Sequence, residues 1–111
     1  MKKYELIAGI DVSKLKLDVN FLLTNDPAHT NHFIVKNNKK GLQELLNRLN
    51  KLKIDLKQVL FSYEDTGVYS MPLCYFLTKQ GLDYWMIPAI EIESVGVRRI
   101  KATQKTLLFM H

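Results

Sequence analysis

The chain has 111 residues, enough for one domain with a core of its own. Its 47% hydrophobic and 24% charged residues are typical of globular proteins and exclude a disordered chain, while a net charge of +5 favours an anionic partner such as nucleic acid. The single cysteine excludes an intrachain disulfide. Glu5 and Asp11 interrupt the first apolar run, which excludes a signal peptide or membrane span there. We therefore expect a cytoplasmic protein with no membrane partner.

The first two elements are predicted to form a hairpin. Tyr4–Val12 is rich in Leu, Ile and Val, as in a buried strand. From Leu15 to Leu23 apolar and polar residues alternate, which predicts a half-buried strand with Leu15 on its apolar face. Only Ser13 and Lys14 separate the two runs, so the connection is expected to be a tight turn.

The rest of the chain alternates between strands and helices. A leucine repeat at helical spacing after Asn37 and Asn38 predicts an amphipathic helix. Asn37 or Asn38 is expected to be the N-cap of this helix. The other predicted elements are a turn at Thr24–Asn31, a short strand at His32–Lys36, a strand at Gln58–Glu64, a helix capped by Ser70 and ended by Gly81, and a strand at Asp83–Pro88.

The connections predict how these elements assemble. Short turns between the first three strands favour antiparallel pairing, whereas the helical connections that follow favour parallel pairing. The expected fold is α/β, a mixed five-stranded sheet with packed helices. This is the arrangement of a ribonuclease-H-like domain.

Two acidic residues stand where strands of such a sheet end. If the strands that end near Asp11 and Glu64 are neighbours, both carboxylates emerge at one edge, where sheets of this kind bind ligands. Paired carboxylates suit Mg²⁺ or Mn²⁺, and a metal pair can activate one oxygen of a phosphodiester and stabilise the other. The alternative is that Asp11 is a turn or capping residue.

Other polar residues near these strands have simpler explanations. Asp18 falls on the polar face and is expected to be solvated, and Asp65 is favoured as a turn former. His29 and His32 lie between a loop and a strand, so no metal site is expected there. Lys14 either reaches a phosphate or is solvated.

Two motifs together carry a resemblance. "GIDVSK" (Gly9–Lys14) combined with "YEDTGVYSMPLCYFL" (Tyr63–Leu77) resembles the N-terminal RuvC-like domain of the DEDD insertion-sequence transposases, a family of bridge-RNA-guided recombinases. The similarity continues through "GLDYWMIPAIEIESVGVRR" to about Arg99. It implies that Asp11 and Glu64 are the first D and the E of the family's catalytic tetrad. In the family these residues coordinate Mg²⁺ for DNA cleavage and exchange.

The sequence departs from the family after Arg99. An ungapped alignment places Thr103 and Thr106 where the resemblance expects the last two aspartates, and no Asp or Glu follows Glu93. The resemblance also leads us to expect that the family's second domain, with its nucleophilic serine, is missing. We therefore expect a RuvC-like domain over residues 1–99, an off-pattern tail over residues 100–111 that a frameshift would explain, and a truncated transposase that binds Mg²⁺ or Mn²⁺ weakly or not at all and is inactive alone.

Two functions remain open at this point. The chain is either a transposase fragment that binds DNA, or a non-catalytic regulatory module that associates with nucleic acid or with full-length transposase. A guide RNA is a further partner that the resemblance implies, and self-association is expected if apolar surface that the missing domain would cover is exposed. Four cations in the tail either contact phosphates or belong to a solvated end of the chain: Arg98, Arg99, Lys101 and Lys105.

Overall fold

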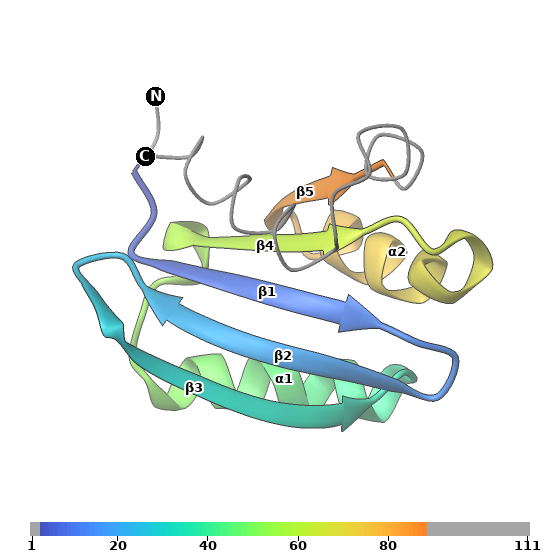
Figure 1. The fold of residues 1–111 in the computed structure, drawn as a ribbon, viewed down its shortest axis with the longest axis horizontal. Coiled ribbons are helices and arrows are strands. Elements are labelled where there is room, and N and C mark those ends of the chain that lie inside the picture. The colour runs from blue at the N-terminus through green and yellow to red at the C-terminus, as the bar shows by residue number, and fades with distance from the viewer. Residues whose placement is uncertain (1–2, 89–111) are drawn as a thin grey trace.

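The computed structural model describes residues 3–88, which form five strands, two α-helices and two short 3₁₀ turns (Figure 1). In chain order they are β1 (Leu6–Val12), β2 (Lys16–Leu23), β3 (Asp26–Lys36), α1 (Lys39–Lys51), the turn η1 (Leu56–Gln58), β4 (Val59–Glu64), the turn η2 (Gly67–Ser70), α2 (Met71–Lys79) and β5 (Asp83–Ile87).

The strands form one mixed sheet in the order β3-β2-β1-β4-β5. The two hairpin-connected pairs, β1 with β2 and β2 with β3, are antiparallel. The pairs joined through helices, β1 with β4 and β4 with β5, are parallel. The predicted mixed five-stranded sheet is therefore confirmed, and β1 lies at its centre between β2 and β4 (Figure 1).

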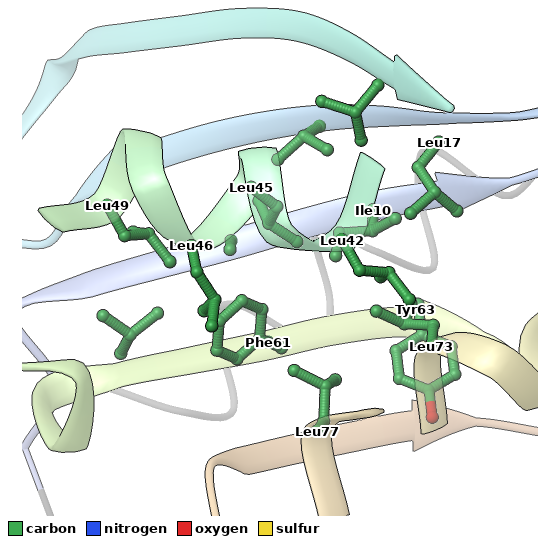
Figure 2. Packing of buried hydrophobic residues seen from close by; sticks show 14 of the residues in the cluster. Ile10, Leu17, Leu42, Leu45, Leu46, Leu49, Phe61, Tyr63, Leu73 and Leu77 are labelled. Carbon is green, nitrogen blue, oxygen red and sulfur yellow. The ribbon is translucent and has the colours of Figure 1, made fainter. Parts of the chain in front are cut away.

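Both helices cover the same face of the sheet. Leucines of α1 at helical spacing point toward Phe61 and Tyr63 of β4, and Leu73 and Leu77 of α2 complete the cluster (Figure 2). Every second residue of β1 from Leu6 to Val12 belongs to this cluster, because side chains alternate between the faces of a strand. The opposite face carries no helix from residues 3–88.

The start of α1 and the end of α2 follow the predicted signals. The Asn38 side chain accepts a hydrogen bond of 2.9 Å from the Gly41 amide, which makes it the N-cap of α1. After α2, the amide of Gly81 donates to the carbonyl of Thr78 and that of Leu82 to the carbonyl of Leu77. This pairing, with Gly81 at φ +68°, is a Schellman motif and confirms Gly81 as the residue that ends the helix.

The first two connections differ from the prediction. Leu15 was expected to face the core but lies in the β1–β2 loop with 76% of its surface exposed, because β2 starts one residue later, at Lys16. The strand β3 begins at Asp26 rather than His32. A register shift in its pairing with β2 accommodates Pro27, which cannot donate a backbone hydrogen bond, so the Asp-Pro pair does not end the strand.

Within the described part of the chain, neither helix has the length and hydropathy required to cross a membrane.

Candidate metal and nucleic-acid site

The two predicted carboxylates lie side by side at one edge of the sheet. β1 and β4 are parallel neighbours, and their register pairs Ile10 with Tyr63. Continuing this register by one residue places Asp11 beside Glu64, on strands that are about 4.8 Å apart. The condition set by the sequence, that the two strands be neighbours, is met (Figure 1).

Both acidic side chains belong to the face that the helices leave open. Ile10 and Tyr63 are buried in the helix-covered core, so the next residue of each strand points to the other side. Asp11 is exposed and Glu64 is half-buried. Both carboxylates therefore lie on the same face of the sheet. The role of the pair as metal ligands stays a prediction.

A third acid lies next to this pair, and sequence reasoning missed its position. Asp18 of β2 stands directly opposite Asp11 in the antiparallel register. Its carboxylate is 3.8 Å from Lys16 Nζ and 3.4 Å from His32 Nε2, so Lys16 partly balances its charge. The hairpin alternation contained this signal, because a two-strand register fixes which residues face each other.

The loop after Glu64 is held by local hydrogen bonds. Asp65 Oδ1 accepts from the Gly67 amide at 2.9 Å and lies 3.2 Å from Ser70 Oγ. Asp65 is thus a turn residue, as predicted. Ser70 precedes α2 but makes no capping bond with its side chain; its hydroxyl instead lies 3.0 Å from the Gly67 carbonyl oxygen. The predicted cap is therefore wrong in its bonding, because the hydroxyl stabilises the loop behind it.

Tyr63, next to Glu64, faces the core. Burial raises the pKa of its hydroxyl, so this group stays protonated throughout the physiological range. Its ring stacks on that of Tyr84 with 6.1 Å between centroids, and this contact holds the end of β4 against β5. Packing on this side of the sheet therefore holds the backbone that carries Glu64 on the other side.

The remaining predicted site residues have different positions. Lys14 is exposed in the loop after β1, two residues beyond the end of the strand that carries Asp11. The tail cations Arg98, Arg99, Lys101 and Lys105 lie outside the described residues, as do Thr103 and Thr106. His29 and His32 contact different carboxylates, Asp26 and Asp18 respectively.

Comparison of the sequence with models of known protein families identifies the family of this chain. A model of the DEDD transposases of the IS110 type, described as transposase, matches residues 8–106. The chain belongs to the DEDD transposase family. The matched stretch includes both acidic residues and extends past Arg99. No curated protein matches the chain.

Membership in the transposase family agrees with the observed architecture. The mixed five-stranded sheet with its two helices is the ribonuclease-H-like fold that the resemblance implied. In this transposase domain the first motif supplies the end of β1, and the second motif supplies the end of β4, η2 and α2. The two motifs are far apart in sequence and adjacent in the sheet.

The residues present fit one divalent ion in part. Mg²⁺ is commonly bound through one or two carboxylates, with water and substrate phosphate filling its other positions. Asp11 and Glu64, neighbours across β1 and β4, would provide such a donor set in the transposase domain. Residues 3–88 contain no group of three or more His, Cys, Asp or Glu side chains placed to hold a metal ion. A site built from these residues alone is therefore limited to two carboxylates.

Proposed function

We propose that this chain is the nucleic-acid- and metal-binding domain of a DEDD transposase. In this proposal Asp11 and Glu64 hold Mg²⁺ or Mn²⁺ against a phosphodiester of DNA. The observation that supports it is the register of β1 and β4, which brings the acidic residue of each family motif to the same edge and face of the sheet. A bound ion would supply the charge that activates the attacking oxygen and stabilises the leaving oxygen.

The chain's own residues would position the DNA. Asp11, being exposed, accepts the ion from solvent, while Glu64 is half-buried on a strand that Tyr63 anchors in the core and defines the ion's position more rigidly. Lys14 is exposed in the loop after β1 and would contact a neighbouring phosphate. This division of roles needs no movement of the sheet.

We further propose that the domain does not cut DNA by itself. Two divalent ions carry four positive charges, which two carboxylates balance only by half. Thr103 and Thr106, at the positions of the family's last two aspartates, add no charge, and a neutral hydroxyl is a poor ligand for a hard cation. Binding of one ion without strand cleavage is the expected result.

The metal site is tested by titrating Mn²⁺ into the chain and measuring the heat of binding. Asp11→Asn should abolish the heat, because it removes one of two charged ligands. Asp26→Asn is the matched control: it makes the same chemical change at the opposite end of the sheet, where Asp26 pairs with Leu23, and should leave the heat in place. Equal heats for wild type and Asp11→Asn would refute the assignment.

The lack of cleavage is tested on supercoiled plasmid with Mg²⁺ and with Mn²⁺. The chain should leave the plasmid intact over hours, at protein concentrations that saturate DNA binding. Nicking that depends on metal and disappears in Glu64→Gln would show that the two carboxylates suffice for catalysis.

The second candidate function is a regulatory module that associates with full-length transposase or with nucleic acid, including a guide RNA. It is favoured by the family fold together with Thr103 and Thr106, which the ungapped alignment places where the last two aspartates are expected. Adding the chain to an active transposase of the family should then reduce strand exchange. Unchanged exchange at a large excess of the chain would exclude this role.

A further inference from the structure

Several residues are buried on the face of the sheet that carries no helix from residues 3–88. Ile7 of β1 pairs with Leu60 of β4, and Ser62 follows two residues later on β4. These residues alternate along their strands with members of the helix-covered cluster, so their side chains point to the other face. Ile7 is nevertheless only 2% exposed, Leu60 3% and Ser62 2%. At the edge of the same face Ile87, which pairs with Glu64, is 6% exposed. This part of the face is therefore covered.

The described residues do not supply this cover. Both helices pack on the other face (Figure 1). Tyr4 lies at the end of the sheet where β4 and β5 begin, because its hydroxyl donates to Asp83 Oδ2 at 2.9 Å. Ser62 is about 6.6 Å farther along β4 than the residue that pairs with Asp83, and Ile87 is about 13 Å farther along β5 than Asp83 itself. The cover at these two positions must come from outside residues 3–88.

The other half of this face shows what uncovered positions look like. Asn20 of β2 pairs with Gly9 of β1 and is exposed. Ile34 of β3 pairs with Asp18 of β2 and keeps 50% of its surface exposed. Directly paired residues share a face, so these positions belong to the same face as Ile7. The cover is therefore confined to β1, β4 and β5, and the face of β2 and β3 lies outside it.

We propose that residues 89–111 of this same chain pack across β5 and β4 onto the first half of β1 and bury these side chains. The burial is that of a single chain, so it does not require a second copy. The described part of the chain also ends at the required place, since Ile87 is the last residue of the edge strand β5 and Pro88 follows it. This packing is independent of the metal and DNA binding proposed above.

The segment has the length and the composition that this cover requires. From Ile87 it must cross two strand spacings, about 10 Å, to reach β1, and must run back about 13 Å to the level of Ile7. Even at the rise of a helix, about 1.5 Å per residue, residues 89–111 extend over about 34 Å. Within its first ten residues the segment supplies four apolar β-branched side chains: Ile90, Ile92, Val95 and Val97.

The proposed cover borders the two carboxylates. Glu64 pairs with Ile87 and is half-buried, whereas Asp11, one strand farther from β5, is exposed. The segment therefore reaches the position of Glu64 and stops before that of Asp11. In this arrangement the residues after β5 belong to the folded domain and are not a solvated end of the chain.

Trp85, the single tryptophan of the chain, is a reporter for this cover. It pairs with Ser62, so it lies on the same face, and it is half-buried. In the full chain with Ile92→Asp and Val95→Asp, two charges would have to enter the apolar contact, and the segment should leave the sheet. The emission of Trp85 should then move to longer wavelength, and its quenching by acrylamide should become at least twofold faster.

The matched control introduces the same two charges at exposed apolar positions. Ile34→Asp combined with Val68→Asp changes side chains that are 50% and 67% exposed, and should keep the wild-type emission and quenching. Circular dichroism shows whether each variant retains its fold. Quenching that is equal in wild type and in the variant with Ile92→Asp and Val95→Asp would overturn the inference.

The wild-type chain allows a second test that needs no substitution. With the methyl groups of Ile, Leu and Val labelled, Ile7, Leu60 and Ile87 should give nuclear Overhauser cross-peaks to methyl groups of residues 89–111. Cross-peaks from these three residues only to residues 3–88 would refute the packing. Cross-peaks between labelled and unlabelled chains in a mixed sample would assign the cover to a second copy, and would refute it as well. If the variant with two aspartates does not fold, these cross-peaks decide the question.

Discussion

Gly41 allows α1 to start directly against the end of β3. It is the third residue of the helix, its amide donates to Asn38 Oδ1, and its missing Cβ leaves room for the carbonyl of Lys36. The N-cap and the close approach thus occur at the same turn. A residue that looks like a weak point in a leucine-rich helix is in fact what lets the helix lie close to the sheet.

We expect Gly41→Ala to destabilise the domain by about 1–3 kcal/mol, the usual cost of overpacking. In a free helix the same change would stabilise by about 1 kcal/mol, so the sign of the effect distinguishes packing from propensity. Urea denaturation followed by circular dichroism measures it. Gln43→Ala, an exposed position of the same helix, is the control and should change stability little. A more stable Gly41→Ala would show that the β3–α1 connection shifts at little cost.

The pKa of the Cys74 thiol, on α2, depends on Tyr84 of β5, which follows it in sequence. Its Sγ lies 3.5 Å from the Tyr84 hydroxyl, which is also 2.9 Å from Thr78 Oγ1, so α2 and β5 meet in a small polar cluster. The hydrogen bond with Tyr84 is the largest cause that lowers the pKa of the Cys74 thiol, because a donated hydrogen bond stabilises the thiolate.

The reactive form of a thiol is the thiolate, so the rate of alkylation by iodoacetamide should rise with pH around this lowered pKa. Tyr84→Phe should move the midpoint of the rate profile to higher pH, since it removes the donor. Thr78→Val should move it in the same direction by less, because its hydrogen bond contributes less. Identical profiles for wild type and Tyr84→Phe would show that the hydroxyl does not act on the thiol.

At the scale of elements, Asn37 joins the two loops that follow the acidic strands. Its Nδ2 donates to the carbonyl of Ser13 at 2.8 Å and to that of Tyr69 at 2.9 Å, and its amide donates to the carbonyl of Leu15 at 3.0 Å. Ser13 and Leu15 belong to the β1–β2 loop, and Tyr69 belongs to η2. One side chain therefore holds together the segments after Asp11 and after Glu64.

Asn37→Asp should lower stability by about 1–3 kcal/mol, because it replaces a donor of two hydrogen bonds with an oxygen facing two carbonyls. Amide exchange at Asn37 should also accelerate. The matched control is the same change at the next residue: Asn38 acts as an acceptor from Gly41, so Asn38→Asp keeps the cap and should be nearly neutral. Equal losses in both variants would contradict the role assigned to Asn37.

The elements also show where sequence reasoning reaches its limit. The leucine repeat of α1, the buried run of β4 and the glycine after α2 each predicted their element correctly, because the signal is local. The predicted start of β3 was wrong, because a register shift in its pairing with β2 accommodates Pro27. No local sequence pattern encodes which strand a segment pairs with. The prediction that Leu15 faces the core was wrong for a related reason. The length of the hairpin loop depends on the register of the two strands that it joins.

At the scale of the whole molecule, the position of the candidate site followed from topology. Two short connections and two helical ones were enough to predict a mixed sheet, and the resemblance identified which acids belong together. The adjacency of Asp11 and Asp18 needed the antiparallel register. Sequence therefore predicts which residues end a strand, whereas the structure alone shows what stands opposite them.

The net charge of +5 is the molecular property that bears on nucleic-acid binding. No acidic residue follows Glu93 in the sequence, so the four tail cations have no acidic neighbour along the chain after that point. If all four contact phosphates of duplex DNA, the logarithm of the binding constant should fall with the logarithm of the salt concentration with a slope of roughly −3 to −4. Fluorescence anisotropy from 25 to 200 mM NaCl measures this slope.

Replacing the tail cations with glutamine should bring the slope to about −1, the contribution of Lys14, because released counterions rather than net charge determine it. A second variant separates these two causes by removing the same charge elsewhere. It replaces four exposed lysines at the two ends of α1, which covers the face opposite the carboxylates, and should keep the wild-type slope. If both variants reduce the slope equally, binding depends on overall charge and the tail has no specific role. The lysines replaced in this control are Lys39, Lys40, Lys51 and Lys53.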